Sequence, residues 1–303
     1  MLLGASGCRA RPLPESAVYP AGTPLATHYV MVNGTRLRYV ATGKGPAVVF
    51  IHGFGASLYG WRKNLEPIAN AGYRVVAFDN RGFGWSDKPA KGYTAEDYAA
   101  LVLGLLDSLD LPDVVLVGHS MGGAVALETA LLAPHRVRGL VLLDPAGFGT
   151  RWPFLLKVAR WPLVGPLVTG MRNRWVVGRI LRSTYADPSK VTDLDVDQYY
   201  APVPDPSYGR SLRGVLREFR FDGLRGRLGA IEQPTLLLWG EKDRWIPLSV
   251  GRAMASELPR VAFVPIQGAG HATPEEAPLE VNNLIIAFLK EGVSKAPENL
   301  AWR

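Results

Sequence analysis

Cysteine is almost absent from this chain of 303 residues, which contains Cys8 and no other. A single cysteine excludes a disulfide within the chain and a cluster of thiolate metal ligands. The histidines and acidic residues also do not follow the H-E-x-x-H spacing or a similar metal signature. The sequence therefore predicts a protein that works without a metal and without an organic cofactor.

Long apolar runs are missing as well. None approaches the roughly 20 residues that a membrane-spanning helix needs. The composition, 48% hydrophobic and 20% charged, is typical of a folded globular protein. A cytoplasmic location is the default expectation from these features.

The N-terminus offers an alternative location. Leu2–Cys8 resembles the end of a bacterial lipoprotein signal, but only seven residues precede Cys8 and none of them is basic. An ordinary signal has a basic start and 7–15 apolar residues. If translation starts further upstream, Cys8 would anchor the protein to the bacterial envelope, and the residues that follow would form a tether.

Acidic residues are too few to balance the basic ones, and the net charge is +7. Most of the excess lies between Phe148 and Glu232, with fourteen Lys and Arg against eight Asp and Glu. The arginines alternate with Trp152, Trp161 and Trp175, without any nucleic-acid-binding signature. We expect no nucleic-acid partner. The segment suits an anionic membrane surface or acidic substrates, or is simply a solvated basic face.

Short apolar runs alternate with helical patterns along most of the chain, which predicts a mostly parallel sheet flanked by helices. Two runs joined by Asn33-Gly34 predict a hairpin with a type I′ turn. The expected strands are 29–32, 36–41, 47–51, 74–78, 114–117, 139–143, 235–239 and 261–265. The expected helices are 60–71, 94–109, 121–133, 248–258 and 275–290, with N-caps predicted at Thr94 and Thr273.

The alternation stops between residues 147 and 231. This stretch contains helical patterns broken by prolines, including one over 172–185 and another that starts at Thr192. We therefore predict a helical lid inserted between two sheet strands. The expected organisation is a disordered tail (1–26), a first core part (27–146), the lid (147–231), a second core part (232–291) and a C-terminal tail (292–303).

The most informative motif is Gly118-His119-Ser120-Met121-Gly122. It follows an apolar strand and precedes a helical pattern, as in the nucleophile elbow, a tight strand-to-helix turn that exposes a serine hydroxyl. Gly118 and Gly122 are needed because side chains there would collide with the neighbouring strand and helix. The motif predicts that Ser120 is a catalytic nucleophile.

A serine needs a base, and that base needs an acid to orient it. His271 lies in a glycine-rich loop after the last strand, and Asp243 follows the preceding strand. The carboxyl ends of parallel strands share one edge of a sheet, so we expect the two residues to meet Ser120 there. Asp144 is a competing acid, because its strand ends at the same edge.

Acyl transfer also needs two backbone N–H groups directed at the developing oxyanion. Met121, directly after the nucleophile, is expected to supply one, and Phe54 the other. Gly53, beside Phe54, allows the backbone to approach a substrate closely. His52 could act as a second base, but we expect it to support this loop through hydrogen bonds.

Five motifs in order now show a resemblance that runs from about residue 28 to 290. They are His52–Gly55, Asp79–Ser86, Gly118–Gly123, the Asp243 loop and the His271 loop. The chain resembles the α/β-hydrolase superfamily, in the lidded group of serine esterases and meta-cleavage-product hydrolases. The resemblance implies that Asp79 and Arg81 support the pocket wall and are not catalytic.

Residue 120 separates the possible functions. Epoxide hydrolases and dehalogenases similar to this chain use an aspartate there, whereas a serine suits attack on an acyl carbonyl. We expect hydrolysis of a small to medium-sized apolar ester. Hydrolysis of a carbon–carbon bond remains open, although those enzymes commonly carry asparagine in place of His119. An interfacial lipase that touches a membrane and a non-catalytic binding protein also fit the sequence. The sequence carries no signal for the oligomeric state.

Overall fold

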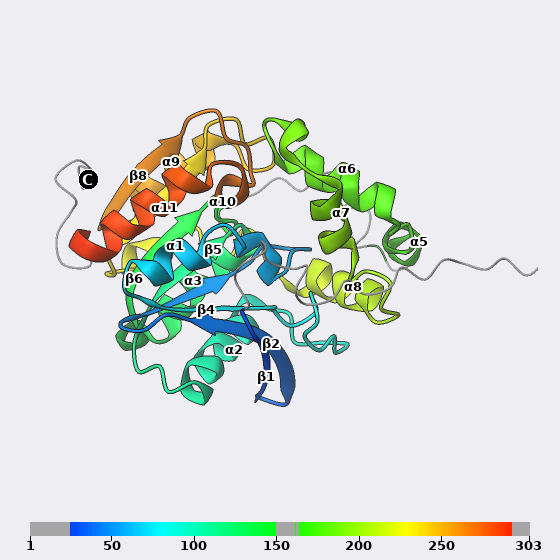
Figure 1. Cartoon of the computed structure of the whole chain (residues 1–303), viewed down its shortest axis with the longest axis horizontal. Coiled ribbons are helices and arrows are strands. Elements are labelled where there is room, and N and C mark those ends of the chain that lie inside the picture. The colour runs from blue at the N-terminus through cyan, green and yellow to red at the C-terminus, as the bar shows by residue number, and fades with distance from the viewer. Residues whose placement is uncertain (1–24, 150–160, 162–163, 293–303) are drawn as a thin grey trace, which may run out of the picture.

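The computed structural model describes residues 25–149, 161 and 164–292. Its centre is an eight-stranded sheet in the order β1-β2-β4-β3-β5-β6-β7-β8 (Figure 1). Strand β1 pairs antiparallel with β2, and β2 pairs antiparallel with β4. The other six strands, β3 to β8, are parallel to one another. The predicted mostly parallel sheet is therefore confirmed. The strands are β1 Thr27–Val32, β2 Thr35–Thr42, β3 Ala47–Ile51, β4 Arg74–Phe78, β5 Val114–His119, β6 Val137–Leu143, β7 Thr235–Gly240 and β8 Val261–Ile266.

The turn between β1 and β2 has the predicted conformation. Asn33 and Gly34 have φ angles of 48° and 72°. A type I′ turn requires positive φ at both central residues, and asparagine and glycine tolerate it best.

Helices cover both faces of the sheet, so its central strands are buried on two sides. In β3, Val49 and Ile51 join the core beneath α2, α3 and α9, whereas Val48 and Phe50 join the core beneath α1 and α11. This alternation follows from the two-residue repeat of a strand. The helices are α1 Leu65–Asn70, α2 Ala95–Ser108, α3 Met121–Leu132, α9 Leu248–Glu257, α10 Thr273–Glu276 and α11 Pro278–Ala287.

Two predicted continuous helices are interrupted, so these expectations were wrong. The 60–71 segment forms a 3₁₀ turn, η2 (Leu58–Trp61), followed by α1. Pro67 has no N–H to bond the carbonyl of Lys63, as a continuous helix would need. Asn282 satisfies that carbonyl instead, by a side-chain hydrogen bond of 2.9 Å.

The second broken helix is the one expected over 275–290. It consists of α10, α11 and a π-helical turn over Phe288–Gly292. Pro278, at the start of α11, interrupts the hydrogen bonding in the same way. The predicted cap at Thr273 was also wrong, because Thr273 begins α10 and its hydroxyl contacts the carboxyl group of Asp144. Thr94 and Thr192 do form capping boxes, with Asp97 and Asp195.

Helices also fill the described part of the chain between β6 and β7, where no strand occurs. They lie together at one end of the molecule, on the right in Figure 1. The helix expected over 172–185 is present as α6. The bounds are α5 Gly165–Gly170, α6 Arg174–Thr184, α7 Asp193–Tyr200 and α8 Tyr208–Glu218. Trp152 lies outside the described residues. We refer to residues 147–231 as the inserted segment.

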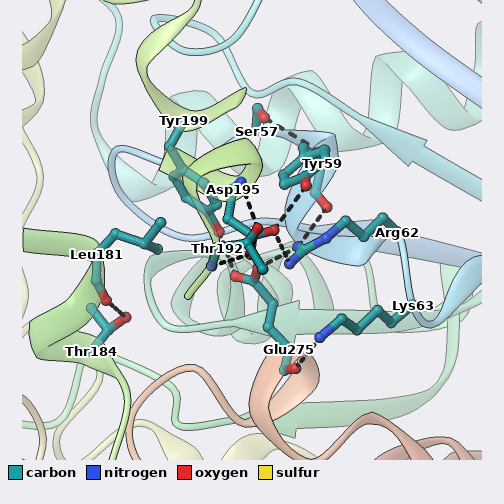
Figure 2. Close-up of polar contacts among 10 residues, drawn as sticks. All are labelled: Ser57, Tyr59, Arg62, Lys63, Leu181, Thr184, Thr192, Asp195, Tyr199 and Glu275. Atoms are coloured by element: carbon teal, nitrogen blue, oxygen red, sulfur yellow. Dashed lines mark hydrogen bonds and ion pairs between the residues drawn. The ribbon is translucent and has the colours of Figure 1, made fainter. Parts of the chain in front are cut away.

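A buried ionic cluster joins the inserted segment to the sheet-bearing part of the chain (Figure 2). The Arg62 guanidinium pairs with Asp195 of α7 at 2.6 Å and with Glu275 of α10. The Tyr59 hydroxyl donates to Asp195 at 2.8 Å, and the Tyr199 hydroxyl donates to Glu275 at 2.5 Å. One cation thus neutralises two carboxylates that belong to distant parts of the sequence.

Among the described helices, none combines the length and the apolar character that crossing a membrane would require. The predicted lipoprotein residue, Cys8, lies outside the described residues.

We expect Arg62→Ala to lower the free energy of unfolding by about 3–5 kcal/mol, because it leaves two buried carboxylates without a cation. Denaturant unfolding followed by circular dichroism would measure the change. Arg36→Ala is the matched control, since Arg36 and Asp87 form an ion pair in which both side chains are about half exposed. That variant should lose at most about 1 kcal/mol. Equal losses in the two variants would contradict the structural importance of the cluster.

Candidate active site

Ser120 lies at a sharp turn between the end of β5 and the start of α3. Its φ and ψ angles are 53° and −119°, a strained conformation for a residue with a side chain. The backbone is fixed on both sides: the Ser120 N–H donates to the carbonyl of Leu143, and the Ser120 carbonyl accepts from the N–H of Ala146. The turn has the geometry that a nucleophile elbow requires.

The glycines around Ser120 make this turn possible. A Cβ atom on Gly122 would lie 2.1 Å from the carbonyl oxygen of Ile51, and one on Gly118 would lie 2.4 Å from the oxygen of Gly122. On Gly53 it would come within 3.0 Å of the Cβ of Ser120. The loop after β3 and the elbow thus approach each other to a distance that side chains would prevent.

Ser120, His271 and Asp243 form a continuous hydrogen-bonded chain. His271 Nε2 lies 2.9 Å from the Ser120 hydroxyl, and His271 Nδ1 lies 2.8 Å from Oδ2 of Asp243. The side chains of His271 and Asp243 are buried, and Ser120 is partly exposed. The structure therefore brings together the three residues that the sequence predicted would meet.

The second carboxyl, Asp144, lies near this chain but not in it. Its Oδ1 accepts the N–H of Gly240 at 2.7 Å, and its Oδ2 contacts the Thr273 hydroxyl at 2.5 Å. Burial raises the pKa of Asp144 well above its usual value, and the neighbouring Asp243 raises it further. Of the two candidate acids, Asp243 is the one hydrogen-bonded to His271.

His52 has the supporting position that the sequence indicated. Its Nε2 accepts the N–H of Asn80 and its Nδ1 donates to the carbonyl of Gly53, both at 2.8 Å. Burial lowers the pKa of His52. A neutral His52 fits this pattern, because one nitrogen must accept and the other donate. The side chain ties the loop after β3 to the loop after β4.

Of the two residues predicted for the oxyanion site, Met121 directly follows Ser120, and Phe54 directly follows Gly53, where an added Cβ would lie 3.0 Å from the Cβ of Ser120. Met121 is the first residue of α3, where N–H groups have no partner one turn earlier in the helix. Phe54 follows Gly53, and its ring packs against Phe83 at a centroid distance of 5.5 Å. The roles of their N–H groups remain predictions.

Asp79 and Arg81 make structural contacts. The Asp79 carboxylate accepts the backbone N–H groups of Leu58 and Trp85 and lies 3.5 Å from Arg38. Arg81 donates to the Thr35 hydroxyl. These contacts fasten the loop after β4 beside the site.

Two aromatic side chains around His271 were not recognised in the sequence as parts of the site. Trp245 stacks on the His271 ring, with a centroid distance of 5.9 Å and an interplanar angle of 11°. Its indole N–H donates to Ser183, at the end of α6. His119 donates from Nε2 to the His271 carbonyl at 2.8 Å. Burial lowers the pKa of His119 to about 3, so it stays neutral near neutral pH. Trp245 follows Asp243 by only two residues, and this closeness in the sequence was the signal that could have placed Trp245 at the site.

The loop that carries His271 is held by the helix that follows it. The Glu276 carboxylate accepts the N–H of Gly270 at 2.7 Å and the N–H groups of Ala186 and Asp187 in the inserted segment. The N–H of Ala272 donates to the carbonyl of Thr184. The catalytic candidate His271 thus sits between two residues that are hydrogen-bonded to fixed partners.

Asp144, Asp243 and His271 offer ligand atoms within 4.8 Å of one another. The same atoms already form the hydrogen bonds described above, and His271 uses its Nδ1 on Asp243 and its Nε2 on Ser120. The arrangement is therefore suited to moving a proton along the chain from Ser120 to His271 rather than to ligating a cation.

Comparison with known proteins identifies the family and the fold. The model of the alpha/beta hydrolase family matches residues 48–284. The uncharacterized hydrolase YugF of Bacillus subtilis is 31% identical over 255 residues, covering 80% of this chain and 89% of the relative. A 2-hydroxy-6-oxononadienedioate/2-hydroxy-6-oxononatrienedioate hydrolase of Cupriavidus pinatubonensis is 33% identical, covering 82% and 88%. Among solved structures, a membrane phospholipase A, a bacterial virulence factor, has a TM-score of 0.77 at 28% identity and covers 93% and 89%.

We expect Gly122→Ala to destabilise the fold by about 1–3 kcal/mol and to abolish labelling of Ser120 by a fluorophosphonate, because the added methyl group meets the backbone of β3. Thermal unfolding and mass spectrometry of the labelled protein would measure the two effects. Gly229→Ala is the matched control, since a Cβ there meets nothing within 4 Å. Normal labelling of Gly122→Ala would show that the elbow tolerates what the structure forbids.

Proposed function

The chain belongs to the α/β-hydrolase family and is a hydrolase, and we propose that it cleaves a small to medium-sized, largely apolar carboxylic ester through an acyl-enzyme. The observation that carries this proposal is the hydrogen-bonded chain from Ser120 through His271 to Asp243. A serine with a base in contact, and an acid that orients the base, is the arrangement that activates a hydroxyl for attack on an acyl carbon.

The reaction follows in two halves. The Ser120 oxygen attacks the ester carbonyl while His271 Nε2 takes the hydroxyl proton, and Asp243 stabilises the charged imidazole. His271 then gives the proton to the leaving alkoxide, which departs as the alcohol. In the second half a water attacks the acyl-enzyme with His271 again as base, and the acid is released as Ser120 regains its proton.

The oxyanion of each tetrahedral intermediate would bind the N–H groups of Met121 and Phe54. Met121 also places this charge at the N-terminus of α3, where the helix dipole favours an anion. His119 and His52 are not needed as bases in this scheme. Their rings are neutral and hydrogen-bonded to the backbone around the site.

We expect Ser120→Ala to lower kcat on p-nitrophenyl esters by a factor on the order of 10⁵–10⁶. Asp243→Asn should lower kcat by about 10⁴, because the amide no longer orients the imidazole. Turnover across a series of acyl lengths would measure both losses and locate the preferred chain length. The control is Ser256→Ala, which removes an exposed serine of α9. Unchanged turnover in Ser120→Ala would remove this mechanism.

A second candidate is hydrolysis of a carbon–carbon bond in a dienoate. It is favoured by the 33% identity to a 2-hydroxy-6-oxononadienedioate/2-hydroxy-6-oxononatrienedioate hydrolase. The two proposals share the site and differ in the substrate. If wild-type Ser120 reacts with a fluorophosphonate but no ester is turned over, while a ring-cleavage dienoate is consumed, the second candidate replaces the first.

The third candidate, an ester hydrolase acting at a membrane surface, is supported by two exposed tryptophans. Trp161 and Trp175 are 63% and 67% exposed, and the Arg179 guanidinium lies 5.1 Å from the Trp175 ring. Tryptophan and arginine together suit the interface of an anionic membrane. The structural likeness to a membrane phospholipase A points the same way.

If this surface binds lipid, Trp175→Ala should weaken sedimentation with phosphatidylglycerol vesicles several-fold. Tyr29→Ala is the matched control. Tyr29 is also an exposed aromatic residue with an arginine guanidinium, that of Arg36, 4.9 Å from its ring, but it lies on β1, outside the inserted segment. Phosphatidylcholine vesicles control for charge. No sedimentation of the wild type with either vesicle would eliminate the membrane candidate and leave the ester proposal intact.

A further inference from the structure

Asp144 is a buried carboxyl group to which the proposed reaction gives no role. It directly follows β6, is 0% exposed, and has a φ angle of 45°, in the left-handed region. Its N–H donates to the carbonyl of Leu238 in β7 at 3.0 Å. Its carboxyl group contacts the Gly240 N–H and the Thr273 hydroxyl. Asp144 therefore touches both loops that carry the partners of Ser120: Gly240 lies three residues before Asp243, and Thr273 two residues after His271.

The surroundings of Asp144 disfavour a second negative charge. Among the residues that the structure describes, the titratable groups that face it are Asp243 and His271, whose ligand atoms lie within 4.8 Å of those of Asp144. None of the ion pairs found in the described residues includes Asp144. Two carboxyl groups so close together in a buried site cannot both ionise without a large cost, so one retains a proton.

The hydrogen-bond donors decide which of the two is ionised. Asp243 lies 2.7 and 2.9 Å from the backbone N–H groups of Trp245 and Ile246, and 2.8 Å from His271. All three are N–H donors, which stabilise a carboxylate. Asp144 has one backbone N–H donor and one hydroxyl, and a hydroxyl can accept as well as donate. A protonated Asp144 therefore keeps both of its contacts.

We propose that Asp144 is a positioning residue that remains a neutral carboxylic acid while Asp243 is ionised. Through its contacts with Gly240 and Thr273, it fixes the loops that carry Asp243 and His271 relative to each other. This inference rests on the proposed roles of Asp243 and His271. Burial raises the pKa of Asp144, in agreement with the geometry. A neutral Asp144 leaves Asp243 as the acid that pairs with the charged imidazole during turnover.

The protonation state has a direct test that does not need activity. We expect the infrared difference spectrum of wild type minus Asp144→Asn at pH 7 to contain the carbonyl band of a protonated carboxyl group. Glu128→Gln is the matched control, because Glu128 is a buried carboxylate that pairs with Arg227. Its difference spectrum should contain a carboxylate band instead. A carboxylate band in the Asp144→Asn difference spectrum would overturn the proposal.

The positioning role is tested by the pH dependence of Ser120 labelling with a fluorophosphonate. Asparagine is neutral and can still accept from Gly240, so Asp144→Asn should leave the acid limb of the labelling profile within a few tenths of a pH unit of wild type. If Asp144 were charged instead, its replacement would remove a charge within about 4–6 Å and would move the acid limb by about 1–3 pH units. Asp144→Ala and Thr273→Val each remove a contact that Asp144→Asn keeps. They should therefore slow the labelling of Ser120 at least tenfold, whereas Asp144→Asn should not.

The outcomes separate this inference from the proposed function. A displaced acid limb in Asp144→Asn, or wild-type labelling rates in Asp144→Ala, would overturn the role of Asp144. A wild-type protein that is folded but neither labels nor hydrolyses any ester would instead overturn the proposed function. The infrared spectrum would still report the protonation state of Asp144 in that case. If Asp144→Ala does not fold, Thr273→Val tests the same contact from its other side.

Discussion

The placement of His271 depends on hydrogen bonds made by the short helix that follows it. Three polar side chains of α10 point to three different parts of the chain: Thr273 to Asp144 after β6, Glu275 to Arg62 after η2, and Glu276 to the inserted segment. A helix of four residues has little stability of its own. Its position is therefore set by these partners, and the position of His271 relative to Ser120 is set with it.

The same contacts limit how the inserted segment can move. The end of α6 is hydrogen-bonded to the His271 loop at Thr184 and to Trp245 at Ser183, and α7 is joined to Arg62 by the buried Asp195. Rigid-body opening of the whole segment would separate the Arg62 ion pairs and withdraw support from His271. Any movement of the inserted segment that keeps the site intact would therefore have to leave the end of α6 and α7 in place.

Much of the fold was readable from the sequence because it rests on local chemistry. Asn33-Gly34 specifies its turn, the apolar runs specify the strands, and the glycines around Ser120 specify the elbow. The broken helices at Pro67 and Pro278 were readable in principle, since a proline removes one helical hydrogen bond. The long-range partners were not: Thr273 has the spacing of an N-cap to Glu276, but its hydroxyl contacts Asp144, 129 residues away. Arg62 likewise gives no sign in the sequence of its two partners.

The choice between Asp144 and Asp243 shows why sequence order alone leaves the acid open. Both residues follow parallel strands that end at the same edge, and both come close to His271. What differs is the backbone around them. The chain turns after Asp243 so that two N–H groups converge on its carboxylate, whereas the Asp144 carboxyl accepts one N–H, from Gly240, and otherwise faces a hydroxyl. Since N–H donors favour the ionised form, the turn after β7 assigns the negative charge to Asp243. In the proposed mechanism, the identity of the charged acid is thus a property of the loop conformation rather than of the residue type.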